Sequence, residues 1–291
     1  MFNHNYIQQI VTGERIQNCA NVYIGNAEDF NFNPYIQSQK NKQELFSEFS
    51  KLSNIKYDNP GIVFCYSHCI HQFKNIIHLF LNPFVLITHN SDENIGYSQS
   101  VNFILNCSLL KKWYAQNIDY IHPKLHFLPI GIANSMWEHG NLTIYNILFR
   151  ANFLTSLSVK SNDVYFYFSL STNPEKRALC KRSIEKKINF LEPLSHVDNI
   201  IRLSQYRFCI CPEGHGLDTH RIWEALYVKT VPIVVRSIHC EIMQNTTGLP
   251  MVILDSWDEF SLDTLPDYDS FDFESCSRYL NMDFYQELFH D

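Results

Sequence analysis

The stretch that decides the fold is Arg207-Phe-Cys-Ile-Cys-Pro-Glu-Gly-His-Gly-Leu-Asp-Thr-His-Arg-Ile-Trp-Glu-Ala-Leu-Tyr227, and Val231-Pro-Ile-Val-Val235 follows shortly after it. The apolar runs at the two ends are typical of parallel strands that are buried on both faces. The two glycines in the middle indicate a tight turn after the first strand, and Asp218 is a suitable N-cap for a helix that begins beside it. The stretch therefore predicts a strand, a turn, a helix and a second strand in succession.

The same succession recurs along most of the chain. Short apolar runs that predict further strands lie at 62–66, 84–88, 125–130, 164–168 and 251–254. Helical patterns lie at 43–52, 108–116, 174–187 and 218–227, and the third opens with Asn173 as a cap and Pro174 in its first turn. Strands that alternate with helices predict an α/β architecture with parallel strands. The tail at 267–291 has aromatic residues at helical spacing, which predicts a helix that can pack back on the first half.

The composition excludes several classes of protein. Of the 291 residues, 45% are hydrophobic and 18% are charged, which allows a sizeable core and excludes a disordered tail. Only nine residues are glycine, and neither a Walker loop nor a G-x-G-x-x-G fingerprint is present. The net charge of -7 argues against a general nucleic-acid binder but allows a local basic pocket for a small anion. The nine scattered cysteines, without a C-x-x-C pair, are typical of free thiols in a reducing compartment.

The apolar stretches predict a protein without a membrane anchor. Residues 1–10 are polar and lack the features of a secretory signal. The longest apolar stretch, 76–87, is interrupted by His78 and by Asn82 and Pro83, and it is too short to span a bilayer. We therefore expect a soluble, cytoplasmic protein with no stable membrane insertion.

The turn between the two strands has residue types that bind phosphate. Glycines at a strand-to-helix turn let backbone N–H groups approach a phosphate, and the helix dipole favours its negative charge. Arg221 and Glu224 lie three residues apart, hence on one face of the predicted helix, where the carboxylate can accept hydrogen bonds from a ribose. A purely structural turn followed by a salt-bridged helix explains the same spacing, so both interpretations stay open at this point.

This segment resembles the C-terminal signature of the exostosin-like glycosyltransferases, the family 47 type. The resemblance lies in the Gly-rich turn, the Arg-x-x-Glu-Ala-Leu motif and the Pro-Ile-Val strand, and a more distant one is to α-1,3-fucosyltransferases. It extends upstream through 86–92, 113–117, 122–126, 128–134 and 137–141. It implies a GT-B fold, in which two Rossmann-like domains face each other across a cleft. The implied parts are an acceptor-binding domain at 1–155, a nucleotide-sugar-binding domain at 156–266 and a helical tail at 267–291.

The resemblance implies that the sugar donor is bound by the turn, by the helix after it, and by the loop after the strand at 164–168. The donor-binding residues expected are Ser171, Thr172, Asn173, Arg177, Pro212, Glu213, Gly214, His215, Gly216, Asp218, Arg221 and Glu224. Arg177 suits a bidentate contact with phosphate, Arg221 adds a second cation, and Glu224 is the carboxylate for the ribose. For Arg177, a solvated helix face is the alternative interpretation.

Catalysis needs a base that takes the proton of the acceptor hydroxyl, and we expect this base in the first half. His89-Asn90-Ser91-Asp92 follows a buried strand, at the edge where the sites of α/β proteins open. Asp92 is the first choice and His89, whose imidazole titrates near neutral pH, is the second. Simple capping of the strand and of the next helix is the alternative. The acceptor-binding residues expected are Asn90, Gly131, Asn134 and Trp137.

Together with these features, the resemblance implies an inverting, metal-independent glycosyltransferase. It would move a sugar from a nucleoside-diphosphate sugar, UDP in preference to GDP, to a hydroxyl of a glycan acceptor. No cofactor, metal site or nucleic-acid partner is expected, and Asp267-Tyr-Asp269 is discounted as a metal clamp because it lies in a late acidic stretch. Two other classes stay open: a metal-dependent phosphoesterase with ligands within 89–92, 139–141 and 218–220, and a non-catalytic carbohydrate-binding protein.

Overall fold

The computed structural model describes residues 6–31, 46–154 and 160–290, and the largest feature of the first half is a six-stranded sheet. In spatial order its strands are β2 (Phe46–Glu48), β1 (Val22–Gly25), β3 (Gly61–Tyr66), β4 (Phe84–His89), β6 (Leu110–Ala115) and β8 (Leu125–Phe127). All neighbouring strands of this sheet are parallel. The chain passes from β1 outward to β2 and returns to β3 on the other side of β1, so the strand order reverses between β1 and β3.

The first half also contains several helices. They are α1 (Tyr6–Gln9), α2 (Gly13–Asn18), α3 (Ala27–Asn31), α6 (Ile70–Ile76), α7 (Gln99–Leu105) and α8 (Thr143–Leu154). The 3-10 helices of this half are Phe49–Asn54, Ser67–Cys69, Ile77–Leu79 and Glu138–Gly140. A small parallel sheet pairs β5 (Ile95–Gly96) with β7 (Ile118–Asp119).

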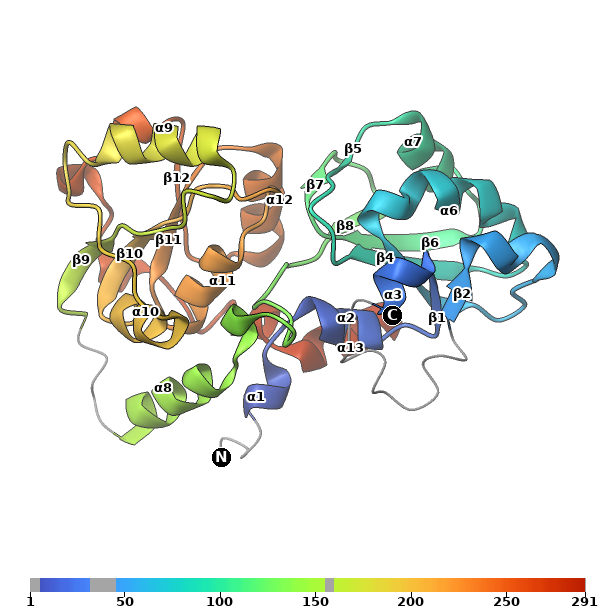
Figure 1. The fold of residues 1–291 in the computed structure, drawn as a ribbon, viewed down its shortest axis with the longest axis horizontal. Helices are drawn as coiled ribbons and strands as arrows, with labels where there is room; N and C mark the ends of the chain where they lie inside the picture. Colours follow the sequence, from blue (N-terminus) through green and yellow to red (C-terminus); the bar gives the residue numbers. More distant parts are fainter. Residues whose placement is uncertain (1–5, 32–45, 155–159, 291) are drawn as a thin grey trace.

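The second half contains a four-stranded parallel sheet, on the left of Figure 1. Its strands in spatial order are β12 (Val252–Leu254), β11 (Val231–Val235), β10 (Tyr206–Ile210) and β9 (Asn162–Tyr165). The helices are α9 (Pro174–Ile184), α10 (His196–Leu203), α11 (His220–Tyr227), α12 (Ile238–Thr247) and, at the C-terminus, α13 (Met282–His290). The later 3-10 helices are Trp257–Glu259, Leu262–Thr264, Tyr268–Ser270 and Ser277–Leu280.

The apolar runs form strands because the sheets are covered on both faces. Every residue of β4 is buried, and so is every residue of β3 after its first. One large apolar cluster contains Phe64 and Trp113 of the first sheet together with Trp223 of α11. A smaller cluster, which includes Phe166 and Phe208, lies on the second sheet with residues of α9. The large apolar cluster therefore extends from the first sheet to α11 of the second half.

The C-terminal helix α13 packs on the first half, beside α2, as Figure 1 shows in red. The hydroxyl of Tyr114 in β6 donates to the carbonyl of Leu288 at 3.2 Å. The hydroxyl of Tyr227 in α11 accepts the N–H of Val11 at 2.8 Å and donates to the carbonyl of Leu280 at 2.8 Å. A single tyrosine thus joins the N-terminal segment, α11 and the chain that leads into α13.

The structure confirms the predicted α/β class with parallel strands. The predicted strands at 62–66, 84–88 and 231–235 are β3, β4 and β11, and α9 begins at Pro174 with Asn173 as its N-cap. The domain boundary expected near residue 155 lies outside the described residues, and α8 occupies the stretch before it. Among the described residues, no helix has the length and apolar character that a membrane crossing requires.

Two predicted helices were wrong. The stretch 108–116 forms strand β6, which lies between β4 and β8 and buries Leu110, Trp113 and Tyr114. Pairing on both sides decides its structure over the helix-like spacing, because strand formation depends strongly on the neighbouring strands. The stretch 43–52 begins outside the described residues and continues as β2, which pairs with β1, and as a 3-10 helix.

Gly131 lies where the chain after β8 meets the start of α2. Its φ of +67° is in the left-handed region, and a Cβ there would lie 2.3 Å from the carbonyl oxygen of Val11. Gly248, the C-cap of α12, has a similar φ of +66°, but a Cβ there would meet nothing within 4 Å. Both positions need the conformational freedom of glycine, and Gly131 also needs its small size.

This comparison predicts that Gly131→Ala destabilises the fold more than Gly248→Ala does. We expect Gly248→Ala to lower the free energy of unfolding by about 1 kcal/mol, the usual cost of an L-residue in the left-handed region. Gly131→Ala adds a clash with backbone that cannot rotate away, so its loss should be about 3 kcal/mol or more. Urea unfolding of the two variants measures both, and equal losses would contradict the close contact with Val11.

Candidate functional site

A cavity of about 230 Å³ lies at the carboxyl ends of the strands of the first sheet. Tyr66 and His89 end β3 and β4, Gln116 follows β6, and all three line the cavity. The other lining residues are Gly13, Asp29, Asn90, Ser91, Asp92, Ile130, Asn134, Met136, Trp137 and His220. The structure therefore brings both predicted bases together with three of the four predicted acceptor residues, and α11 of the second half contributes His220.

His89 is fully engaged by its neighbours and is 1% exposed. Its Nε2 lies 2.8 Å from the carbonyl oxygen of Pro129, and its Nδ1 accepts the backbone N–H of Asn90 at 2.8 Å. The tautomer with the proton on Nε2 satisfies both contacts. Burial lowers the pKa of His89 to about 4. Since neither ring nitrogen has a free lone pair, His89 is the weaker of the two candidate bases.

A chain of amide groups forms part of the cavity wall. Asn90 donates to the side-chain oxygen of Gln17 at 2.8 Å and accepts a hydrogen bond from the Asn134 amide at 3.1 Å. Asn134 in turn accepts the backbone N–H of Glu14 at 2.8 Å. A Cβ on Gly13 would lie only 2.0 Å from the side-chain oxygen of Asn90. The two predicted acceptor residues are thus held in fixed orientations, and Gly13 leaves the space for them.

Asp92 and Trp137 are the exposed members of the cavity lining. One carboxylate oxygen of Asp92 lies 3.9 Å from Nδ1 of His215, which belongs to the turn after β10, and both side chains are mostly exposed. Trp137 is 47% exposed, and its ring lies nearly parallel to that of His139 at 6.2 Å. The preferred base therefore faces the predicted donor turn across a short, solvent-accessible gap.

The two loops predicted to bind the donor are held to each other. Asn173 caps α9 and donates its side-chain amide to the carbonyl of Gly214 at 2.7 Å. Arg177 donates to the carbonyl of Glu213 at 2.9 Å and to that of Ser169 at 2.8 Å. Lys176 forms an ion pair with the carboxylate of Glu213. Residues 171–177 and 213–214, which are far apart in the sequence, therefore form one structural unit.

Arg177 of this unit is buried, and Arg221 of α11, which is near it, is partly buried. Arg177 is bound by backbone carbonyls and, among the described residues, by no carboxylate. Burial, and after it the positive charge of Arg221, lowers the pKa of Arg177 to about 10. Arg221 lies 3.0 Å from the carboxylate of Glu224 and above the ring of Tyr165. Within the described part of the chain, its buried Nη1 has no hydrogen-bond partner. The arrangement has an excess of positive charge and a free donor.

Glu224 lies on the same face of α11 as Arg221, as its spacing predicted. Only 6% of its side-chain surface is exposed, and its carboxylate is directed to Arg221. In this arrangement Glu224 orients the arginine. A hydrogen bond to a ribose, the predicted role of Glu224, requires that a ligand reach the small exposed part of the carboxylate.

A row of aromatic rings connects the cavity to the neighbourhood of Glu224. The ring of His139, which stacks on Trp137, lies 6.0 Å from that of His220 and 6.4 Å from that of His196. Burial lowers the pKa of His196 and of His220, and the nearby charge of Glu224 partly opposes this shift. The row therefore places three imidazoles between the predicted acceptor side and the predicted donor side.

Asp218 has a different position from the one predicted. Helix α11 begins at His220 with Thr219 as its N-cap, so Asp218 does not cap it. The carboxyl group of Asp218 is buried and accepts the N–H of Ile130 at 2.7 Å and the indole N–H of Trp223 at 2.9 Å. Burial raises the pKa of Asp218 to about 7. Its oxygens are thus used inside the protein, where they hold the turn to the loop after β8.

The two glycines of the turn have different surroundings. A Cβ on Gly216 would lie 2.5 Å from the side-chain amide of Asn117, which is buried and accepts the N–H of Asp218 at 2.8 Å. A Cβ on Gly214 would be 3.5 Å from Arg177, an ordinary contact. Gly216 therefore permits the contact between the turn and the loop after β6, whereas Gly214 lies against the arginine that we expect to bind the donor.

A second cavity, of about 390 Å³, lies at the carboxyl ends of β10, β11 and β12. It is lined by two predicted donor residues, Pro212 and Glu213, and by the side chains that follow β11 and β12, among them Arg236 and Trp257. Arg177, Arg221 and Glu224 do not line it. The predicted donor residues are therefore divided between this cavity and the region of the two arginines.

Several residues of the site were not predicted from the sequence. Gly13, Gln17 and Glu14 come from α2, and His196 comes from the start of α10. Their local sequence carries no motif, and only the fold places them beside Asn90, Asn134 and Glu224. The buried carboxylate of Glu14 also accepts hydrogen bonds from the backbone and the hydroxyl of Ser135, at 3.2 and 3.1 Å.

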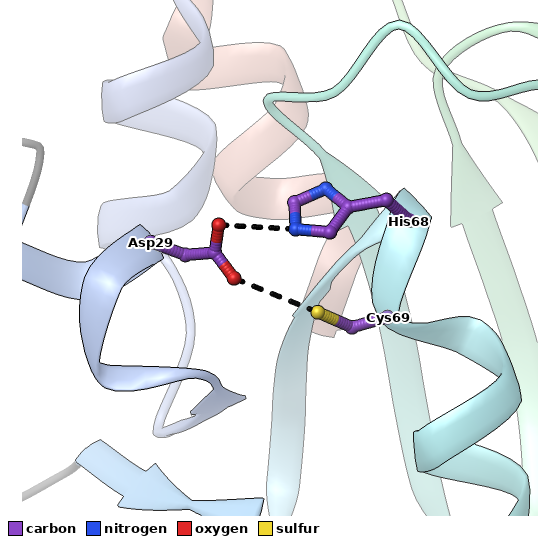
Figure 2. A group of neighbouring side chains, drawn as sticks. All are labelled: Asp29, His68 and Cys69. Carbon is purple, nitrogen blue, oxygen red and sulfur yellow. Dashed lines mark hydrogen bonds and ion pairs between the residues drawn. The ribbon is translucent and has the colours of Figure 1, made fainter.

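One group of side chains has the composition of a metal site. Among the described residues, Asp29, His68 and Cys69 are the only His, Cys, Asp or Glu side chains that gather in a group of three or more with ligand atoms within 4.8 Å of one another (Figure 2). None of the ligands considered for a phosphoesterase, within 89–92, 139–141 and 218–220, belongs to this group.

Comparison of the chain with protein-family models and with curated proteins found no match. The exostosin-like resemblance therefore rests on the motifs of the sequence alone.

Burial of neutral His89 predicts a specific dependence of stability on pH. Its pKa is lowered from 6.5 to about 4 in the folded protein. As the pH falls through this range, the unfolded chain takes up a proton that the folded one does not, so the free energy of unfolding falls. The contribution is on the order of 3 kcal/mol.

Urea unfolding at the two ends of this pH range measures the effect. The difference between them should be clearly smaller in His89→Gln than in the unsubstituted protein. A long-range proton–nitrogen NMR spectrum that showed both His89 nitrogens protonated near the middle of the range would contradict the lowered pKa, because the buried imidazole would then be charged.

Proposed function

We propose that this protein is an inverting glycosyltransferase that uses a nucleoside-diphosphate sugar, with UDP preferred to GDP, and a glycan hydroxyl as acceptor. The observation that carries the proposal is the pair of neighbouring arginines: Arg177, which is buried against Gly214, and Arg221, whose side chain is only 17% exposed. Arg177 has no carboxylate partner in the described chain, and Arg221 has a buried N–H group without any partner there.

A diphosphate would complete this arrangement. A buried donor left without a hydrogen bond costs about 1–3 kcal/mol, and two neighbouring positive charges add repulsion. The oxygens of a diphosphate accept several hydrogen bonds and carry the opposite charge, and guanidinium groups bind them in pairs. The carboxylate of Glu224 does not replace the diphosphate as a partner, because it is already paired with Arg221.

The acceptor would occupy the cavity at the end of the first sheet. Asp92 is exposed there and can take the proton of a sugar hydroxyl, while Asn90 and Asn134 offer oriented amide groups. The exposed ring of Trp137 offers a face for a sugar ring. The contact between Asp92 and His215 places this base next to the donor turn.

The proposed reaction is a direct displacement. An acceptor oxygen forms a bond to the anomeric carbon of the donor as the bond from that carbon to the diphosphate breaks. The hydroxyl proton passes to the carboxylate of Asp92, and the negative charge that develops on the diphosphate is stabilised by Arg177 and Arg221. No metal is needed to stabilise that negative charge, because the two arginines already provide positive charge beside it.

A GT-B arrangement fits this division of roles. The loops after β4, β6 and β8 all contact the turn after β10, through Asp92 with His215, Asn117 with Gly216, and Ile130 with Asp218. The carboxyl edges of the two parallel sheets are thus joined at the proposed site. On this proposal, 1–155 binds the acceptor, 156–266 binds the nucleotide sugar, and 267–291 is the tail.

The arginines predict how nucleotide binding responds to substitution. Arg221→Lys and Arg177→Lys keep a positive charge but lose the fork of donors, so UDP should bind on the order of tenfold to a hundredfold more weakly. Arg207→Ala is the matched control, because it removes an exposed cation that pairs with Asp163 on the same sheet.

Calorimetric titration with UDP and with GDP, in the presence of a chelator, measures these affinities, and thermal unfolding verifies that each variant is folded. Unchanged affinity in both folded arginine variants would contradict the proposed diphosphate site.

If Asp92 is the base, its substitution should reduce sugar transfer without weakening nucleotide binding. Asp92→Asn keeps the size of the side chain but cannot accept the proton, so transfer should fall by at least a hundredfold while UDP affinity is unchanged. The matched variant Asp163→Asn replaces an exposed carboxylate elsewhere and should transfer normally. Release of UDP from UDP-sugars with a panel of glycans follows turnover. A fully active Asp92→Asn would remove Asp92 as the base, and nucleotide binding without any transfer would favour a non-catalytic carbohydrate-binding protein.

A further inference from the structure

We propose that Asp29, His68 and Cys69 bind a zinc ion. This site lies in the first half, apart from the arginines of the second half, and it has no part in the proposed chemistry of the donor.

The fold brings the three side chains together from two neighbouring strands. β1 and β3 are adjacent and parallel, with Ile24 opposite Cys65, so the segments that follow them leave the sheet at the same edge. α3, which follows β1, carries Asp29, and the 3-10 helix at Ser67–Cys69, which follows β3, carries the other two. The strand order reverses between β1 and β3, and in open parallel sheets ligands bind at the carboxyl ends of the strands at such a point.

The geometry of the three side chains suits a single metal ion. One oxygen of Asp29 lies 3.0 Å from Nε2 of His68, and the other lies 3.6 Å from Sγ of Cys69. Tetrahedral ligands at zinc bond lengths stand about 3.3–3.8 Å apart, so small rotations of the side chains are sufficient. Figure 2 shows the carboxylate of Asp29 directed between the imidazole and the thiol.

The donor set favours zinc among the common metals. Calcium and magnesium prefer oxygen ligands, whereas an imidazole, a thiolate and a carboxylate together are typical zinc ligands. Three protein ligands leave the fourth position of a tetrahedral ion for water or a substrate. Asp29 also lines the cavity proposed for the acceptor, and His68 is partly exposed, so an ion has access from solvent.

Neighbouring groups hold the three side chains in place. The side-chain amide of Asn26 donates to Sγ of Cys69 at 3.4 Å and lies 3.3 Å from the carboxylate of Asp29. The hydroxyl of Tyr66 donates to the backbone carbonyl of Asp29 at 3.1 Å, and its ring packs against that of His68. Partners of this kind orient the ligands of a metal site and increase its affinity.

A role for Cys69 as a free nucleophile fits the surroundings less well. The thiol of Cys69 is buried and donates to a carboxylate oxygen of Asp29 at 3.6 Å, so its nearest charged neighbour is negative. Reactive cysteines need the opposite, an electropositive environment. A metal ion supplies that positive charge and displaces the proton.

Cobalt(II) provides the test that depends least on variants. The intact protein, freed of metal by a chelator and loaded with one equivalent of Co²⁺, should show a thiolate-to-cobalt charge-transfer band in the near ultraviolet. The band should disappear in Cys69→Ser and persist in Cys107→Ser, a control that removes a partly buried thiol outside the proposed site. A loaded wild-type protein without this band overturns the proposal.

Zinc affinity then tests the other ligands, by competition with a chromophoric chelator. Asp29→Asn and His68→Gln should each weaken Zn²⁺ binding at least a hundredfold, and Asn26→Ala about tenfold to a hundredfold. His78→Gln, in the 3-10 helix at Ile77–Leu79 that follows α6, should leave the affinity unchanged. Zn²⁺ should raise the unfolding temperature of wild type and of His78→Gln but not of the ligand variants. Wild-type affinity in a folded Asp29 or His68 variant overturns the proposed ligand set.

Discussion

The contact between the two sheets depends on hydrogen bonds that converge on the turn at 214–218. Asp218, buried within the protein, accepts the N–H of Ile130 from the loop after β8 and the indole N–H of Trp223 from α11. Asn117, after β6, accepts the N–H of Asp218 where Gly216 leaves room for it. A buried carboxyl group is costly unless its hydrogen bonds are satisfied, so this position tolerates little change in the relative placement of the sheets.

This constraint determines what lies on each side of the turn. On one side, His215 faces Asp92 at the edge of the first cavity. On the other side, Gly214 and Glu213 are bound by Asn173 and Arg177, which brings α9 to the turn. Arg177 is thereby buried against a backbone that is already fixed, with Arg221 near it. Fixed positive charge of this kind is what the proposed leaving diphosphate would require. The excess of positive charge at the two arginines supports the proposed function more than any single motif does.

The sequence predicted the parts of the structure that local patterns control. The apolar runs located β3, β4 and β11, and the cap and proline at 173–174 located the start of α9. The sequence did not predict β6, because pairing with two neighbours outweighs its local pattern. Asp218 was misplaced for a related reason: its acidic side chain suits an N-cap, but tertiary hydrogen bonds take it into the interior.

The residues of the candidate site are also of two kinds: those that a local pattern predicts and those that only the fold brings together. His89, Asn90 and Asp92 were predicted because they follow a recognisable strand, and they do line one cavity. Their partners in α2, and the group of Asp29, His68 and Cys69, could not be predicted, since residues some forty positions apart meet there only through the pairing of β1 with β3. The nearly complete burial of Glu224 could not be predicted from the local sequence either, because its surroundings include Tyr145 of α8 and His196 of α10, which come from other parts of the chain.

The most direct test of the account is a crystal structure of the protein soaked with UDP or GDP. We expect density for the diphosphate within hydrogen-bond distance of Arg177 and Arg221, beside the backbone at Gly214. Nucleotide bound only in the second cavity, among Pro212, Arg236 and Trp257, or no bound nucleotide at all, would contradict it.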